Sequence, residues 1–99
     1  MNNPAPEKLE ISSPDIFITA SPNPFVDNNT IRYHVETPSN VTIAVFDSKG
    51  ALVKMLVNQR QDAGVYSVQW NPGNIDKGTY FVQALTNGTV KQSISLIKQ

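Results

Sequence analysis

Apolar and polar residues alternate along several short stretches of this chain, as they do in β-strands that bury one face. The alternation is clearest in two stretches, with apolar positions at Ile31, Tyr33 and Val35 and then at Val41, Ile43 and Val45. Two later stretches follow the same scheme with aromatic members, at Tyr66, Val68 and Trp70 and at Tyr80, Val82 and Ala84. No stretch keeps the period of an amphipathic helix over several turns. The pattern therefore predicts a chain built from strands.

Further strands are predicted at residues 15–20, 51–58 and 89–98, and turn residues separate neighbouring strands. Asn87–Gly88 is the strongest short hairpin signal. The residues from Asn58 to Gly64 are expected to form a polar crossing between two strands. Strands spaced by turns about every ten residues predict an all-β fold, an immunoglobulin-like sandwich of two antiparallel sheets with about seven strands. Its bulky core members are expected to be Phe25, Tyr33, Tyr66, Trp70 and Tyr80.

The first 15 residues differ from the rest in composition. Pro4, Pro6 and Pro14 favour extended, solvated backbone, and few large aliphatic side chains are present to form a core. We expect residues 1–15 to be a flexible, proline-rich linker from an upstream cargo domain. The sandwich is expected to occupy residues 16–99 as one domain.

The charge balance narrows the classes of partner. Eight Lys and Arg residues are matched by eight Asp and Glu residues, so no basic surface is expected for nucleic acid. Cysteine is absent, which excludes disulfides and thiolate chemistry. The N-terminal residues lack the basic and apolar regions of a signal peptide. Export of this domain would therefore need a signal further upstream.

The chain offers little from which an active site is built. His34 is the only histidine and lies on the polar face of its predicted strand, where a solvated side chain is expected. Without cysteine, a zinc site would need carboxylates nearly alone, and the residues after Asp27 lack the spacing of a calcium loop. No glycine-rich phosphate loop follows a strand. We expect neither enzymatic activity nor a cofactor or bound metal.

Phe46 and Phe81 fall on the opposite faces of their strands from the predicted core residues. Exposed aromatic rings stack on sugars in carbohydrate-binding modules, but they also cap the ends of sandwiches or lie under loops. A structural spacer or a carbohydrate-binding immunoglobulin-like module of an extracellular protein therefore stays open as an alternative function.

The segment "SPNPF" at residues 21–25 places one asparagine between two prolines, shortly before a strand. Both prolines withhold a backbone donor, so no partner strand pairs continuously through Pro22 to Pro24. Asn23 precedes a proline and is pushed toward extended backbone. The expected result is a rigid kink that ends the first strand and protects a sheet edge.

The order of the motifs is more informative than any one of them. "SPNPF" is followed by "TIRYHV" at 30–35, "VTIAVFDSKGALVKMLV" at 41–57, "DAGVYSVQWN" at 62–71, "KGTYFVQAL" at 77–85 and "SLIK" at 95–98. In this order the motifs resemble the C-terminal sorting domain of proteins exported by the type IX secretion system of Gram-negative bacteria. The resemblance extends from Phe17 to Lys98.

This resemblance implies a delivery role. Domains of this family sit at the C-terminus of diverse cargo proteins and are recognised in the periplasm by the type IX translocon and an outer-membrane shuttle protein. They are typically removed by a sortase-like cysteine protease, and the cargo is released to the medium or anchored at the cell surface. Here the resemblance implies cleavage within residues 1–20, and the linker is where we expect it.

The resemblance also suggests which residues the translocon recognises. They comprise the proline motif, the glycine-bearing central motif and the terminal lysine: Pro22, Asn23, Pro24, Asp47, Gly50, Gly64, Gly78, Tyr80 and Lys98. Lys91, which with Lys98 brackets the alternating part of the last strand, is expected to belong to the same surface. Gln99 follows the terminal lysine, which departs from chains that end on the lysine itself. We expect the last strand to contact the translocon partly by strand addition along its edge.

Overall fold

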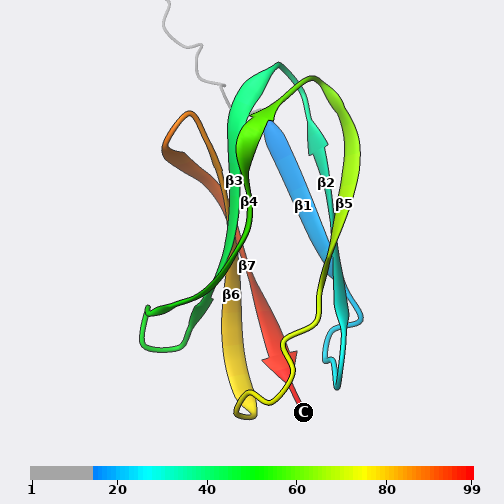
Figure 1. Cartoon of the computed structure of the whole chain (residues 1–99), viewed down its shortest axis with the longest axis vertical. Helices are drawn as coiled ribbons and strands as arrows, with labels where there is room; N and C mark the ends of the chain where they lie inside the picture. The colour runs from blue at the N-terminus through cyan, green and yellow to red at the C-terminus, as the bar shows by residue number, and fades with distance from the viewer. Residues whose placement is uncertain (1–14) are drawn as a thin grey trace, which may run out of the picture.

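The computed structural model describes residues 15–99. It contains seven strands, β1 (Ile16–Ser21), β2 (Asn29–Val35), β3 (Ser39–Asp47), β4 (Leu52–Gln61), β5 (Gly64–Trp70), β6 (Gly78–Thr86) and β7 (Thr89–Lys98). The strands form two antiparallel sheets, ordered β1–β2–β5 and β4–β3–β6–β7, which face each other (Figure 1). The predicted all-β, two-sheet sandwich is confirmed. Among the described residues, no helix is long and apolar enough to cross a membrane.

The core lies between the two sheets and is built from alternate residues of the strands, as the pattern predicts. The side chains predicted to face inward on β2, β3 and β6 are all buried. Phe25, Trp70 and Tyr80 form a chain of aromatic rings, with centroids 5.5 Å and 6.0 Å apart. Tyr66 is only half-buried, because β5 lies at the edge of its sheet, and it stacks on Tyr33 at 5.3 Å.

The prediction of a polar crossing from Asn58 to Gly64 is wrong in its extent. Asn58 to Gln61 continue β4 and pair with residues 39–42 of β3, so the connection to β5 is short. These polar residues are tolerated in a strand because β4 is an edge strand whose side chains are largely exposed. The buried member, Gln61, accepts a hydrogen bond of 2.9 Å from the hydroxyl of Tyr33.

The assignment of one face of β3 to the core can be tested at Ile43, which is fully buried in this central strand. Ile43→Ala leaves a cavity and is expected to lower the free energy of unfolding by about 2–5 kcal/mol in chemical denaturation. The control is Thr42→Ala, on the outer face of the same strand, which should cost less than about 1 kcal/mol. Equal losses in the two variants would contradict the assignment.

Candidate functional site

The proline motif lies against the last strand of the sandwich, at the lower end of the molecule in Figure 1. The side-chain amide of Asn23 donates from Nδ2 to the carbonyl oxygen of Ser95 at 2.9 Å. Its Oδ1 accepts from the backbone N–H of Ile97 at 3.0 Å. Residues 22–25 are called the strap below, because they cross the outer edge of β7.

Phe25 extends this contact with its backbone. Its N–H donates to the carbonyl oxygen of Ile97 at 2.8 Å, and its carbonyl oxygen accepts from the N–H of Gln99 at 2.9 Å. Together these bonds make a parallel bridge between Phe25 and Lys98 in a protein whose sheets are otherwise antiparallel. The ring of Phe25 is buried against Trp70. The strap is therefore held both by hydrogen bonds and by an apolar anchor.

The arrangement gives a physical reason for an asparagine between two prolines. Pro22 and Pro24, each preceded by a cis peptide bond, have no N–H with which to pair. The amide of Asn23 supplies both a donor and an acceptor, so its side chain takes the place of a backbone partner. Asn29, the buried first residue of β2, fixes the strap from the other side by donating to the carbonyl of Pro22.

The strap changes the expectation of strand addition at β7. The outer edge near its C-terminal end already has partners, and further along the strand the side chain of Gln92 accepts from the N–H of Ile18 at 2.8 Å. An added strand would therefore have to displace these contacts. The expected protection of a sheet edge is present, and the protected edge is that of β7.

Gly64, Gly78 and Tyr80 belong to two copies of one motif, Asp-x-Gly-x-Tyr, which the sequence analysis missed. Each copy opens a strand, "DAGVY" at β5 and "DKGTY" at β6. In each copy the tyrosine hydroxyl donates at 2.6 Å to the carbonyl oxygen of the aspartate four residues earlier. This bond is a tyrosine corner, which fixes the direction in which the chain enters a strand. The repeated spacing in the sequence was the signal that would have revealed it.

The two glycines of the repeat have φ angles of +156° at Gly64 and +141° at Gly78, which L side chains rarely adopt. Each glycine lies midway between the aspartate and the tyrosine, where the backbone bends so that the tyrosine hydroxyl reaches back to the aspartate carbonyl. Both glycines thus have a conformational role in the fold.

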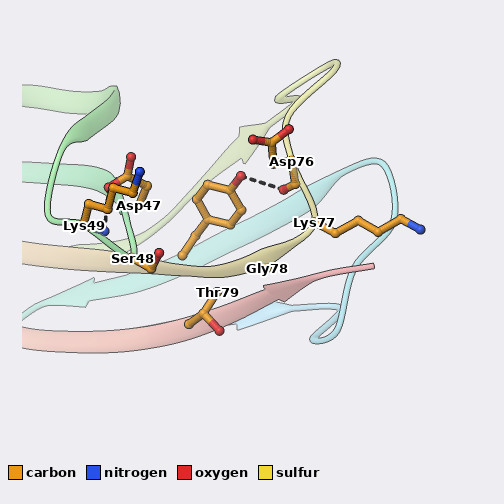
Figure 2. Close-up of a pocket in the computed structure, with 8 residues that line it drawn as sticks. Asp47, Ser48, Lys49, Asp76, Lys77, Gly78 and Thr79 are labelled. Atoms are coloured by element: carbon orange, nitrogen blue, oxygen red, sulfur yellow. Dashed lines mark hydrogen bonds between the residues drawn. The ribbon is translucent and has the colours of Figure 1, made fainter.

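Asp47, Gly78 and Tyr80 border a hollow of about 220 Å³ between the β3–β4 turn and the start of β6 (Figure 2). The carboxylate of Asp47 accepts from the N–H groups of Lys49 and Ala51, both at 2.9 Å, and so holds the turn that ends at Gly50.

Burial, with the negative charges of Asp76 and Asp47, raises the pKa of Tyr80, which keeps its hydroxyl a donor. Among residues 15–99 no three His, Cys, Asp or Glu side chains are grouped to hold a metal ion.

The predicted recognition residues divide between the two ends of the molecule. The strap and the residues around the hollow adjoin each other, because Gly78 of β6 pairs with Lys98 of β7. Gly64 and Lys91 lie at the opposite end, near the β4–β5 connection and the β6–β7 hairpin (Figure 1). The structure thus brings eight of the ten residues to one end: Pro22, Asn23, Pro24, Asp47, Gly50, Gly78, Tyr80 and Lys98.

Lys91 has a partner of its own at the upper end. Its Nζ donates to the carboxylate of Asp15 at 3.0 Å, and the hydroxyl of Thr86 donates to the same group. Burial favours a higher pKa for Asp15, but the hydrogen bonds from Lys91 and Thr86 and the charge of Lys91 lower the pKa below its usual range. This contact ties the start of β1 to the β6–β7 hairpin.

These motifs lie in a part of the chain that matches a known protein family. A family model described as the secretion system C-terminal sorting domain matches residues 19–99. No curated protein matches the chain. A similar fold occurs in dimeric latent PorU from Porphyromonas gingivalis, with a TM-score of 0.70 and 19% identity, over 84% of this chain and 9% of PorU.

A second similar fold occurs in the alkylpurine DNA glycosylase AlkC from Pseudomonas fluorescens, solved with DNA containing an abasic site analogue. Its TM-score is 0.52 at 15% identity, over 92% of this chain and 32% of AlkC. This chain therefore spans a small part of either protein, and both likenesses concern the fold.

Removal of the strap's side-chain amide tests its contribution. Asn23→Ala is expected to lower the free energy of unfolding by about 1–2 kcal/mol, because two hydrogen bonds are lost. Hydrogen exchange should become faster at the amide of Ile97. Val26→Ala is the control, since Val26 is exposed directly after the strap, and it should change the stability by about 0.5 kcal/mol or less. Unchanged exchange at Ile97 in Asn23→Ala would refute the pairing.

The dependence of folding stability on acid pH tests the contact between Asp15 and Lys91. A carboxylate whose pKa is lowered by folding contributes stability above its unfolded pKa of about 4, and that contribution is lost as the pH falls through the folded pKa. Asp15→Asn should therefore lose less stability than the wild type on acidification below about pH 4. Lys91→Met, which removes the partner, should show the same flattened profile in urea denaturation. Profiles parallel to that of the wild type would count against the ion pair.

Proposed function

Because this chain belongs to the family of type IX secretion system C-terminal sorting domains, we propose that it directs an attached cargo protein across the outer membrane of a Gram-negative bacterium. The observation that carries the proposal is the family match, which runs from within β1 to the end of the sandwich. The family description refers to a sorting role rather than a catalytic one. In this proposal the cargo reaches the cell surface or the medium by way of the periplasm.

The lower end of the sandwich is the proposed recognition surface for the type IX translocon and the outer-membrane shuttle protein. The strap and the last strand are fixed to each other by four hydrogen bonds, so a receptor that contacts one contacts the other in a defined geometry. The exposed residues Pro22, Asn23 and Pro24 lie beside Lys98 there.

The position of this surface suits a signal that serves unrelated cargo. β1 begins at the upper end of the molecule, so a domain that precedes residue 15 is attached there (Figure 1). The strap and Lys98 lie at the lower end, away from the attachment point. A receptor at the lower end therefore needs no contact with the cargo.

Cleavage by a sortase-like cysteine protease is the second part of the proposal. A cut within residues 1–15 would leave every strand of the sandwich intact, whereas a cut within β1 would remove a strand that pairs with β2 along its whole length. We therefore place the cleaved bond before Ile16. The sandwich can therefore stay folded when it is separated from the cargo.

A carbohydrate-binding or spacer role is the alternative. Phe46 and Phe81 are cross-strand partners on the outer face of the four-stranded sheet, where Phe81 is 36% exposed. They border a hollow of about 330 Å³ that also includes the polar side chains of Gln83 and Ser93. This combination of rings and polar groups is the observation that favours a sugar ligand as the second candidate.

An export assay tests the sorting role. Residues 1–99 are fused behind a periplasm-directed fluorescent protein and expressed in a bacterium with the type IX system. The reporter is expected in the medium or on the cell surface, and this signal should vanish in a strain that lacks the translocon. Mass spectrometry of the exported reporter should find its C-terminus within residues 1–15. A reporter that stays in the periplasm beside an exported control signal would contradict the proposal.

Two variants sharpen the assay. Deletion of residues 97–99 also removes the partners of Phe25, so a loss of export would not separate recognition from folding. Lys98→Ala keeps those backbone bonds and is expected to reduce export while the melting temperature stays within a few degrees of wild type. Lys91→Met removes the expected recognition lysine at the other end, and unchanged export in this folded variant would confine recognition to the lower end.

A further inference from the structure

The first and last strands of the sandwich contact each other and run in the same direction. β1 and β7 belong to different sheets, and both run from the upper to the lower end of the molecule in Figure 1. The contacts between the two segments agree with this direction, because the partners rise together in number along both. They are Asp15 with Lys91, Ile18 with Gln92, Asn23 with Ser95 and Ile97, and Phe25 with Ile97 and Gln99.

We call this set of contacts between residues 15–25 and residues 91–99 the seam. It comprises the ion pair of Asp15 with Lys91 and five further hydrogen bonds. Buried side chains support the seam from both segments, namely Ile16, Ile18, Phe25 and Leu96. On the opposite side of the sandwich, no hydrogen bond within residues 15–99 joins β4 to β5. Polar contacts therefore tie the two sheets together mainly between the first and last strands.

The parallel direction of the two segments decides how the seam responds to tension. A domain that precedes residue 15 pulls on the upper end of β1, and a receptor bound at Lys98 holds the lower end of β7. Tension between these two points draws the segments past each other along their length, so every contact of the seam is loaded at once. A slide of one residue, about 3.3 Å, takes each hydrogen bond out of range. The contacts must therefore break together.

Tension applied at one end of the seam acts differently. If both points of attachment were at the upper end, the contacts would open one after another, beginning with the ion pair of Asp15 with Lys91. Each step would then break only one or two hydrogen bonds, each of which contributes about 1 kcal/mol. The same contacts thus resist tension strongly along the segments and weakly across them.

From this geometry we propose that the seam is a mechanical clamp, which keeps the sandwich folded while cargo and receptor are pulled apart along its long axis. The inference rests on the proposed function for its two points of attachment, the cargo before residue 15 and the receptor at Lys98. The clamp itself is a property of the folded domain and can be measured without export. Asn23 is a positioning residue of the clamp, because its amide makes two of the five hydrogen bonds.

The test applies a constant force to single molecules of the whole chain through introduced cysteines, since the sequence contains none. Asn2→Cys with Gln99→Cys loads the seam lengthwise and keeps the backbone N–H that donates to Phe25. Asn2→Cys with Thr89→Cys places both attachments toward the upper end, because Thr89 begins β7 there. At the same force, the lengthwise pair is expected to stay folded at least about tenfold longer, because several hydrogen bonds must break together.

Two kinds of variant separate mechanical resistance from overall stability. Asn23→Ala removes two hydrogen bonds of the seam and is expected to shorten the lifetime of the lengthwise pair about 5–30-fold. Gln92→Ala, which removes the bond to Ile18, should act in the same direction with a smaller effect. Ile43→Ala lies outside the seam and destabilises the fold more, but β3 is still packed when the seam breaks. Its effect on this lifetime should therefore be smaller than that of Asn23→Ala.

Two results would overturn the proposal. Equal lifetimes in the two pulling geometries would mean that the seam bears no directional load. A larger effect of Ile43→Ala than of Asn23→Ala in the lengthwise pair would mean that the resistance follows overall stability. Neither result bears on the sorting role, and a failed export assay would not alter the lifetimes measured under force.

Discussion

The pairing of Phe25 with the last strand is the contact on which the lower end of this sandwich depends. Its backbone bonds to Ile97 and Gln99 close the edge of β7, and its ring reaches Trp70, which in turn meets Tyr80. One short segment thus joins both sheets and brings the two prolines next to Lys98. The tyrosine corner at Tyr80 continues this framework into the β5–β6 loop. The proposed recognition surface is therefore a product of packing, and its shape follows from buried residues rather than from mobile loops.

The sequence was sufficient to predict the fold because the central strands obey simple alternation. Ile31, Tyr33 and Val35, and later Val41, Ile43 and Val45, are buried as their spacing indicates. Each of those strands has one face in the core and a neighbour on both sides, so local pattern and tertiary environment agree. The edge strand β4 does not follow this alternation. Because one of its sides is open to solvent, β4 tolerates the polar residues of its second half, and its composition does not distinguish a strand from a loop.

The site was less predictable, for reasons of range and geometry. The sequence indicates that Asn23 sits in a kink, but its partners Ser95 and Ile97 lie more than 70 positions away and no local pattern connects them. The predicted recognition residues include Gly64, Gly78 and Tyr80 but not Tyr66. The repeated Asp-x-Gly-x-Tyr spacing nevertheless encodes the same local bond in both copies, between residues four apart. Lys91 has a structural partner in Asp15, at the other end from Lys98. Motif order thus indicates the family, while the contacts that explain individual residues require the folded chain.

The late position of the strap's partners has a consequence for the timing of folding. Leu96 completes the core, and Ile97 and Gln99 complete the bonds to Phe25, so the sandwich has no closed form until these residues have left the ribosome. During synthesis the earlier strands would hold an unpaired β6 edge and an uncovered Phe25, which keeps the nascent chain open. A domain that is closed by residues this late in its sequence stays open to machinery that needs an unfolded chain until those residues have been synthesised.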